Sequence, residues 1–137
     1  MTMCGRVLVV EDDAVLRETL EEVLRDEGHE VRTAAHGQEA LDLMDEWHPE
    51  LIILDLMMPV MDGFAFRDEQ LRKGIALGTR VLVLSAARDL EAAATRVTAD
   101  AFLSKPFRLD EVLSSVSLLL GAPGRYGPGD GTSPPVS

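Results

Sequence analysis

The feature that most constrains the fold is a regular alternation between short apolar segments and longer stretches with helical periodicity. The apolar segments lie at residues 6–10, 30–34, 51–54, 80–85 and 101–104. The first, third and fourth are runs of Val, Ile and Leu without polar alternation, which is typical of central parallel strands buried on both faces. The second, "EVRTA", alternates polar with apolar residues, and we therefore expect it at an edge of the sheet.

The stretches between these segments have the period of amphipathic helices. Their faces are marked by Leu16, Leu20, Val23 and Leu24; by Ala40, Leu41, Met44 and Trp47; by Phe64, Arg67 and Leu71; by the alanine-rich segment 88–97; and by Leu109, Val112, Leu113, Val116, Leu119 and Leu120. The first helix is expected to end at Gly28, as a C′ glycine, the second before Pro49 and the third near Gly74.

Five strands that alternate with five helices predict an α/β fold, a (βα)5 doubly wound five-stranded parallel sheet with right-handed crossovers. The common strand order of such a flavodoxin-like sheet is 2-1-3-4-5, with ligands bound outside the carboxyl ends of the strands, where strands one and three diverge. We expect this domain to span residues 1–120. The Gly- and Pro-rich segment 121–137 is expected to be a disordered tail or the start of a linker.

The formal net charge is −11, which disfavours direct binding to nucleic acid because phosphate recognition needs clustered Lys and Arg. No apolar run approaches the ~18 residues of a membrane span, and no secretory signal is recognised. Cys4 is the only cysteine, so an intramolecular disulfide is excluded. These features predict a cytoplasmic domain without membrane contact.

Polar residues follow the predicted strands where each strand ends. These are Glu11, Asp12 and Asp13 after the first strand, Asp55 at the third, Ser85 at the fourth and Lys105 after the fifth. Carboxylates at one edge repel one another unless they bind a proton, an ammonium group or a divalent cation. An all-oxygen site suits Mg²⁺, and a carboxylate can attack phosphorus to give an aspartyl phosphate. We therefore expect Asp55 to accept a phosphoryl group, whereas Asp13 alone is equally typical of a helix N-cap.

Four segments, "VLVVEDD", "LIILDLMMPVMDG", "VLVLSA" and "AFLSKPF", resemble the signature segments of the receiver domain of two-component response regulators, the CheY-like family. The resemblance runs from residue 6 to the end of the last predicted helix. It implies that Asp55 is the phospho-acceptor and that Glu11 and Asp12 are the acidic pair, with Asp12 the direct metal ligand. The main-chain carbonyl of Met57 is implied as a further ligand of Mg²⁺ or Mn²⁺.

By the same resemblance, Ser85 and Lys105 contact the phosphoryl group. Phe102 is an aromatic switch residue that turns inward when the Ser85 hydroxyl moves. The side chains of Met57 and Ala87 flank the path of the attacking water. Since neither side chain can orient that water, slow autodephosphorylation is expected.

The family takes a phosphoryl group from a sensor histidine kinase, a phosphotransfer protein or a small phosphodonor, and signals to a downstream protein by changing conformation. It is not a conventional enzyme, although phosphorylation of Asp55 is expected to be self-catalysed. Two alternatives remain within the family. The chain could be a phosphorelay intermediate, or the truncated receiver of a longer regulator with an output domain.

The sequence departs from the family's pattern at two places. Lys105 follows Ser85 by twenty residues, slightly fewer than is usual, and Thr98 stands where a Gly is usual. Both departures fall on the face at which many relatives dimerise or bind partners. Pro106 keeps the pattern, and a cis peptide bond is expected after Lys105.

Rival functions fit the sequence less well. A phosphatase of the haloacid dehalogenase type needs a second Asp two residues after the nucleophile, where this chain has Met57. A flavin-binding flavodoxin needs a phosphate-cradling loop after the first strand, and the acidic "EDDAV" segment would repel the flavin phosphate. A receiver that no longer accepts phosphate is disfavoured because the acidic pair, the acceptor, the hydroxyl and the lysine are all present.

Overall fold

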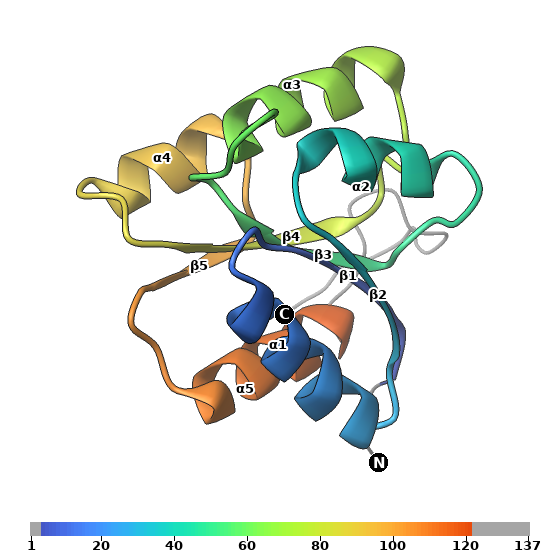
Figure 1. Cartoon of the computed structure of the whole chain (residues 1–137), viewed down its shortest axis with the longest axis vertical. Helices are drawn as coiled ribbons and strands as arrows, with labels where there is room; N and C mark the ends of the chain where they lie inside the picture. The colour runs from blue at the N-terminus through green and yellow to red at the C-terminus, as the bar shows by residue number, and fades with distance from the viewer. Residues whose placement is uncertain (1–3, 122–137) are drawn as a thin grey trace.

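A central parallel sheet lies between two layers of helices in the computed structural model, which describes residues 4–121 (Figure 1). The strands are β1 (Arg6–Val10), β2 (Glu30–Ala34), β3 (Leu51–Asp55), β4 (Arg80–Ser85) and β5 (Ala101–Ser104). The helices are α1 (Ala14–Asp26), α2 (Gly37–Met44), α3 (Gly63–Lys73), α4 (Leu90–Arg96) and α5 (Leu109–Gly121). The sheet order is β2-β1-β3-β4-β5 and all neighbours are parallel, which confirms the predicted fold and strand order.

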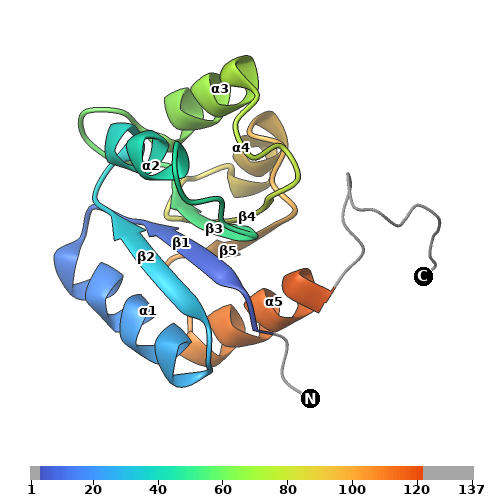
Figure 2. The same ribbon diagram turned by 90° about the vertical axis from the view of Figure 1, so that its right-hand side faces the viewer.

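The helices divide between the two faces of the sheet. Figure 2 shows α1 and α5 on one face and α2, α3 and α4 on the other. Along β1, Leu8 and Val10 pack with the second group of helices, whereas Val7 and Val9 pack with α1 and α5. Both faces of the central strands are therefore buried, which explains why their sequences lack polar alternation.

The ends of α1 and α3 follow local signals in the sequence. Asp13 is the N-cap of α1, and Gly28 lies just beyond its end with a φ of +97°, as expected for a C′ glycine. Gly74 ends α3 in the left-handed conformation. Helix α4 is shorter than the predicted segment 88–97 because it begins only at Leu90 and ends at Arg96.

The inner face of α3 differs from the predicted one. Leu71 was expected to share the buried face with Arg67, but it is 44% exposed. Arg67 is buried as expected, and the other buried residues of α3 are Gly63, Phe66 and Gln70. Gly63, Phe66 and Gln70 are spaced by three and four residues, as on one face of a helix. Two of the three large buried side chains, those of Arg67 and Gln70, are polar, so the apolar pattern of the sequence did not identify the face.

The predicted tail, residues 121–137, is described at its first residue alone. Gly121 is the last residue of α5, and residues 122–137 lie outside the described residues. Within residues 4–121, no helix combines the length and apolar character that a membrane span requires.

Candidate functional site

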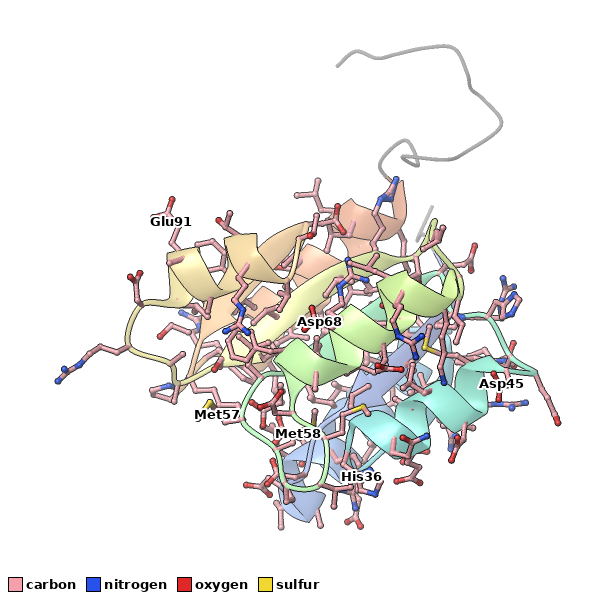
Figure 3. The ribbon with its side chains drawn as sticks, turned by 90° about the horizontal axis from the view of Figure 1, so that it is seen from above. His36, Asp45, Met57, Met58, Asp68 and Glu91 are labelled. Atoms are coloured by element: carbon pink, nitrogen blue, oxygen red, sulfur yellow. The ribbon has the colours of Figure 1, made fainter. Side chains whose placement is uncertain are left out.

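The carboxyl ends of the parallel strands bring the predicted site residues to one edge of the sheet. Glu11 and Asp12 follow β1, Asp55 ends β3, and Lys105 follows β5. The loop that leaves β3 carries Met57 and Met58, both labelled in Figure 3, along the same edge. The strand order explains why Glu11 and Asp55 lie close together. Some forty residues separate them in the sequence, but β1 and β3 are neighbours in the sheet.

Three carboxylates form the centre of the site. One oxygen each from Glu11, Asp12 and Asp55 lies within 4.8 Å of the others. Glu11 is 2% exposed and Asp55 is 3% exposed, whereas Asp12 faces solvent. A set of oxygen ligands with one solvent-facing side suits Mg²⁺, which keeps several of its waters when a protein binds it. The donor set therefore fits the metal that the sequence predicts.

Lys105 is the cation of the site. Its Nζ lies 3.0 Å from Glu11 Oε1 and 3.5 Å from Asp55 Oδ2. Burial alone would lower the pKa of this ammonium group, but the hydrogen bond to Glu11 and the charge of Asp55 raise the pKa above its ordinary value. Lys105 is therefore charged throughout the neutral range, and it offsets part of the repulsion between the two buried carboxylates.

One ammonium group does not balance the carboxylates. Burial and the neighbouring charge of Glu11 raise the pKa of Asp55 to about 7, although the Met57 N–H and the Lys105 ammonium act in the opposite direction. Asp55 is thus a carboxylate for which ionisation is unfavourable in the metal-free protein. A divalent cation between the carboxylates would stabilise the ionised form, which is the form that can attack phosphorus.

The β1–α1 loop separates the roles of its acidic residues. The Asp13 carboxylate accepts a hydrogen bond of 3.1 Å from Leu16 N–H and caps α1, while its own N–H donates to Glu11 Oε2 at 3.2 Å. Arg17, on the first turn of α1, donates from Nη1 to the carbonyl oxygen of Glu11 at 2.9 Å. Sequence reasoning did not identify Arg17. Its position four residues after an N-cap was a usable signal, because helical side chains point back toward the N-terminus.

The β3–α3 loop turns back sharply against its own strand. Met57 N–H donates to Asp55 Oδ1 at 3.2 Å, and the Met57 side chain is 63% exposed beside the site. Gly63 N–H donates to Leu56 O at 3.0 Å. A Cβ on Gly63 would lie 2.8 Å from Asp55 O, so only glycine permits this close approach. Gly63 thereby fixes the loop that carries the Met57 carbonyl, a role that sequence reasoning missed.

The predicted switch residues lie on β4 and β5. Ser85 is fully buried at the end of β4, and its Oγ accepts a hydrogen bond of 3.1 Å from Ala87 N–H. Lys105 N–H donates to Ser85 O at 2.9 Å, which joins the ends of the two strands. Phe102 pairs in register with Val83 and is 42% exposed, outside the carboxylate cluster. The peptide bond between Lys105 and Pro106 is cis.

The sequence of this chain is similar to the sequences of known response regulators. The family model of the response regulator receiver domain matches residues 7–117. Transcriptional regulatory protein PdtaR of Mycobacterium tuberculosis is 40% identical over 116 residues, which cover 82% of this chain and 55% of PdtaR. Response regulator MprA of Mycolicibacterium vanbaalenii is 37% identical over 115 residues, which cover 84% of this chain and 50% of MprA. The chain thus spans about half the length of the curated relatives it matches.

The fold also matches solved structures. Response regulator TrrA of Thermotoga maritima, solved in complex with Mg²⁺-BeF, superposes with a TM-score of 0.73 and is 33% identical. The match covers 83% of this chain and 97% of TrrA. A putative response regulator from Chloroflexus aurantiacus gives a TM-score of 0.78 at 33% identity and covers 86% of this chain and 98% of that protein.

Proposed function

The chain belongs to the response regulator receiver family, and on that premise we propose that Asp55 is the residue that accepts the phosphoryl group. The single observation that supports this assignment best is the pairing of buried Asp55 with Lys105, whose Nζ lies 3.5 Å from Asp55 Oδ2. The ammonium group is therefore placed to contact oxygens of a group bonded to Asp55. Asp13, the third acidic residue after β1, caps α1 instead.

The transfer forms one bond and breaks one. A carboxylate oxygen of Asp55 attacks phosphorus, and the bond from phosphorus to the donor breaks. When the donor is a phosphohistidine of a sensor kinase or a phosphotransfer protein, the imidazole nitrogen leaves and takes up a proton. When the donor is acetyl phosphate, acetate leaves. Lys105 stabilises the negative charge on the transferred oxygens, and its link to Glu11 holds it in place.

Asp12, Asp55 and the Met57 carbonyl are the groups that would hold Mg²⁺ or Mn²⁺, with Glu11 as their neighbour. The bound ion would neutralise charge on the phosphoryl oxygens. Both Glu11 oxygens are engaged, one with Lys105 Nζ and one with Asp13 N–H. Asp12 faces solvent and is the more available ligand of the acidic pair. TrrA, whose solved complex contains Mg²⁺, supports the choice of ion by analogy.

Signalling would follow from contacts that the new phosphoryl group makes. Ser85 Oγ accepts a hydrogen bond of 3.1 Å from Ala87 N–H. A phosphoryl group on Asp55 would offer charged acceptors to the Ser85 O–H group. When the hydroxyl moves toward them, the space near β4 opens to the exposed Phe102 ring, and the surface of β5 changes for a downstream protein.

Intact-mass measurement with acetyl phosphate tests the proposal. The wild-type chain should gain one phosphoryl group in Mg²⁺ and none in EDTA. Asp55→Asn should gain none under either condition, because an amide is a poor nucleophile. Asp13→Asn is the matched control, since it makes the same chemical change at the same edge of the sheet but alters a helix cap, and it should still be modified.

Three outcomes would count against parts of the proposal. Modification of Asp55→Asn would show that another residue is the acceptor. Equal modification with and without EDTA would remove the metal's role. A wild-type chain that acetyl phosphate leaves unmodified in Mg²⁺ would contradict self-catalysed phosphorylation.

A further inference from the structure

We propose that Arg17 is a positioning residue that holds the β1–α1 loop in the shape that metal binding requires. This inference rests on the proposed metal site at Asp12 and Asp55, and it concerns a residue that touches neither metal nor phosphoryl group. Arg17 acts through the backbone of the two acidic residues.

The contacts of Arg17 are directed at the acidic pair. Its Nη1 lies 2.9 Å from the carbonyl oxygen of Glu11 and 3.4 Å from that of Asp12. One charged donor thus bridges two consecutive peptide groups, those that precede and follow the Asp12 side chain. Hydrogen bonds from a charged donor are roughly twice as strong as neutral ones. The guanidinium group fixes the orientation of both peptide planes and, through them, the direction of the Asp12 side chain.

The other hydrogen bonds of the β1–α1 loop involve groups on either side of the two carbonyl groups that Arg17 contacts. Glu11 N–H donates to Ala34 O at 3.0 Å and anchors the loop to β2. Asp13 N–H donates to the Glu11 carboxylate, and the Asp13 carboxylate caps α1. These bonds secure the amide of Glu11 and both polar ends of Asp13. The two carbonyl groups between them are the ones that Arg17 secures.

The β1–α1 loop needs such a constraint because the carboxylates of Glu11 and Asp12 repel each other and the carboxylate of Asp55. Three carboxylates within 4.8 Å of one another favour a loop that opens and lets exposed Asp12 move away from Asp55. A loop that opens in the metal-free protein must be ordered again when the metal binds, and that ordering lowers affinity. Partners that orient metal ligands typically change affinity ~10- to 100-fold. Arg17 reduces this loss by keeping the loop closed beforehand.

A purely electrostatic role of Arg17 and a positioning role predict opposite effects of its loss on the affinity for Mg²⁺. If Arg17 acted only as a positive charge near a cation site, its removal would tighten Mg²⁺ binding, since like charges repel. If Arg17 holds the loop, its removal weakens Mg²⁺ binding. The direction of the change therefore separates a positioning role from simple electrostatics.

Arg25 provides a matched control on the same helix. Its Nη2 also donates to a backbone carbonyl, that of Val31, at 3.0 Å. It also pairs with Glu21 at 2.8 Å. Arg25→Met removes the same charge and the same kind of hydrogen bond as Arg17→Met, but it does so on the last turn of α1, away from the acidic loop.

The experiment is a titration of the full ¹⁵N-labelled chain with MgCl2, followed by amide shifts, together with amide hydrogen exchange in EDTA. Arg17→Met should bind Mg²⁺ about tenfold more weakly than wild type, as expected for loss of a group that orients ligands. Arg25→Met should match wild type, and Arg17→Lys should fall between, because an ammonium group can reach one carbonyl but does not reproduce the guanidinium geometry. Exchange of the Asp13 amide should be faster only in the Arg17 variants.

Several results would overturn the inference. These are Mg²⁺ binding by Arg17→Met that equals or exceeds that of wild type, an equal loss in Arg25→Met, or an unchanged Asp13 exchange rate. If Arg17→Met fails to fold, Arg17→Lys decides the question by the same measurements. A wild-type chain that binds no Mg²⁺ would refute the proposed metal site itself, and the inference with it. If the wild type binds Mg²⁺ and the Arg17 variants bind it equally well, the inference about Arg17 is refuted but the proposed metal site is not.

Discussion

At the scale of single residues, the proposed phospho-acceptor Asp55 carries a cost to stability. The raised pKa of Asp55, about 7 against an ordinary 3.8, means that the folded state holds a proton more tightly than the unfolded state does. Between these two values a rise in pH therefore destabilises the metal-free fold, since the carboxylate must ionise in a buried site beside Glu11. Below the lower value both states are protonated, and above the upper value the full cost is present.

Asp55→Asn should accordingly stabilise the protein in EDTA. The gain should grow as the pH rises from 4 toward 7 and stay constant above, at about 4 kcal/mol near pH 8, because an amide is never ionised and each pKa unit corresponds to ~1.4 kcal/mol. Urea unfolding at pH 5 and pH 8 measures it. Asp68→Asn, at an exposed position on α3 (Figure 3), is the control and should show no comparable dependence on pH. A lower urea midpoint for Asp55→Asn at pH 8 would contradict this account.

Met57 should control how long the phosphorylated state lasts. Its side chain is 63% exposed beside Asp55 and offers no group that can orient an attacking water by a strong hydrogen bond. Water positioning or general-base help is typically worth ~10² to 10⁴ in rate. Met57→Asn should therefore shorten the lifetime of the phosphorylated domain in Mg²⁺, by tenfold or more on that scale. The decay of the phosphorylated mass over time is the measurement.

Met57→Leu is the matched control for this prediction, because leucine keeps the apolar bulk and cannot position water. It should decay like wild type. Equal rates for wild type, Met57→Asn and Met57→Leu would show that the residue at position 57 does not set the lifetime.

At the scale of elements, α4 is the part of the fold whose ends are least predictable from local signals. Its C-terminus forms a complete Schellman motif, in which Thr98 N–H donates to Thr95 O at 3.0 Å and Ala99 N–H donates to Ala94 O at 2.9 Å. Thr98 occupies the left-handed position of this motif with a φ of +58°. A β-branched residue is unfavourable there, and glycine is the usual choice.

Thr98→Gly should therefore stabilise the protein by ~0.5–1 kcal/mol, which is the left-handed strain of ~1–2 kcal/mol less the entropy cost of a glycine. Urea unfolding in EDTA measures the change. Thr95→Gly, an exposed position inside the same helix, should act in the opposite direction by a similar amount. If Thr98→Gly destabilises as Thr95→Gly does, the left-handed conformation is not strained.

Buried Arg67 explains how α4 tolerates its short length. Its Nε donates to Val97 O at 2.8 Å and its guanidinium also contacts the side-chain oxygen of Gln70, so a charged group from α3 caps the C-terminus of α4. Gln70 in turn donates to Ile75 O at 3.1 Å. This polar layer joins α3, α4 and the loop before β4, and it takes the place of apolar packing on the inner face of α3.

At the scale of the whole molecule, negative charge dominates. The net charge of −11 makes the folded state repel itself. Simple salt should raise stability by screening, since exposed charges separated by more than about 10 Å are screened at ~0.1 M ionic strength. A specific Mg²⁺ site should add to that effect, because an ion that binds only the folded state stabilises it.

MgCl2 should therefore raise the urea midpoint more than NaCl does at equal ionic strength. The excess should be about 1.4 kcal/mol when free Mg²⁺ is ten times its Kd. Asp12→Asn, which removes an exposed proposed ligand, should abolish most of the excess while it keeps the response to NaCl. Identical midpoints in the two salts would indicate screening alone.

The sequence by itself determined the order of elements, the burial of the central strands and the edge at which the site lies. Runs of Val, Ile and Leu determine these features, because a strand without polar alternation must be covered on both faces and parallel neighbours then end at one edge. The convergence of Glu11, Asp55 and Lys105 at that edge follows from strand order alone. The end of α1 at Gly28 is likewise local.

Only the tertiary structure decided which polar groups satisfy one another. Arg67 and Gln70 are buried because carbonyl groups at the end of α4 and in the loop after α3 face them, and Leu71 is left exposed although it is apolar. The bond from Arg17 to Glu11 depends on how α1 leaves the sheet. A sequence pattern records the polarity of each residue, whereas hydrogen bonds depend on the distance and direction between groups. Chain packing sets both quantities.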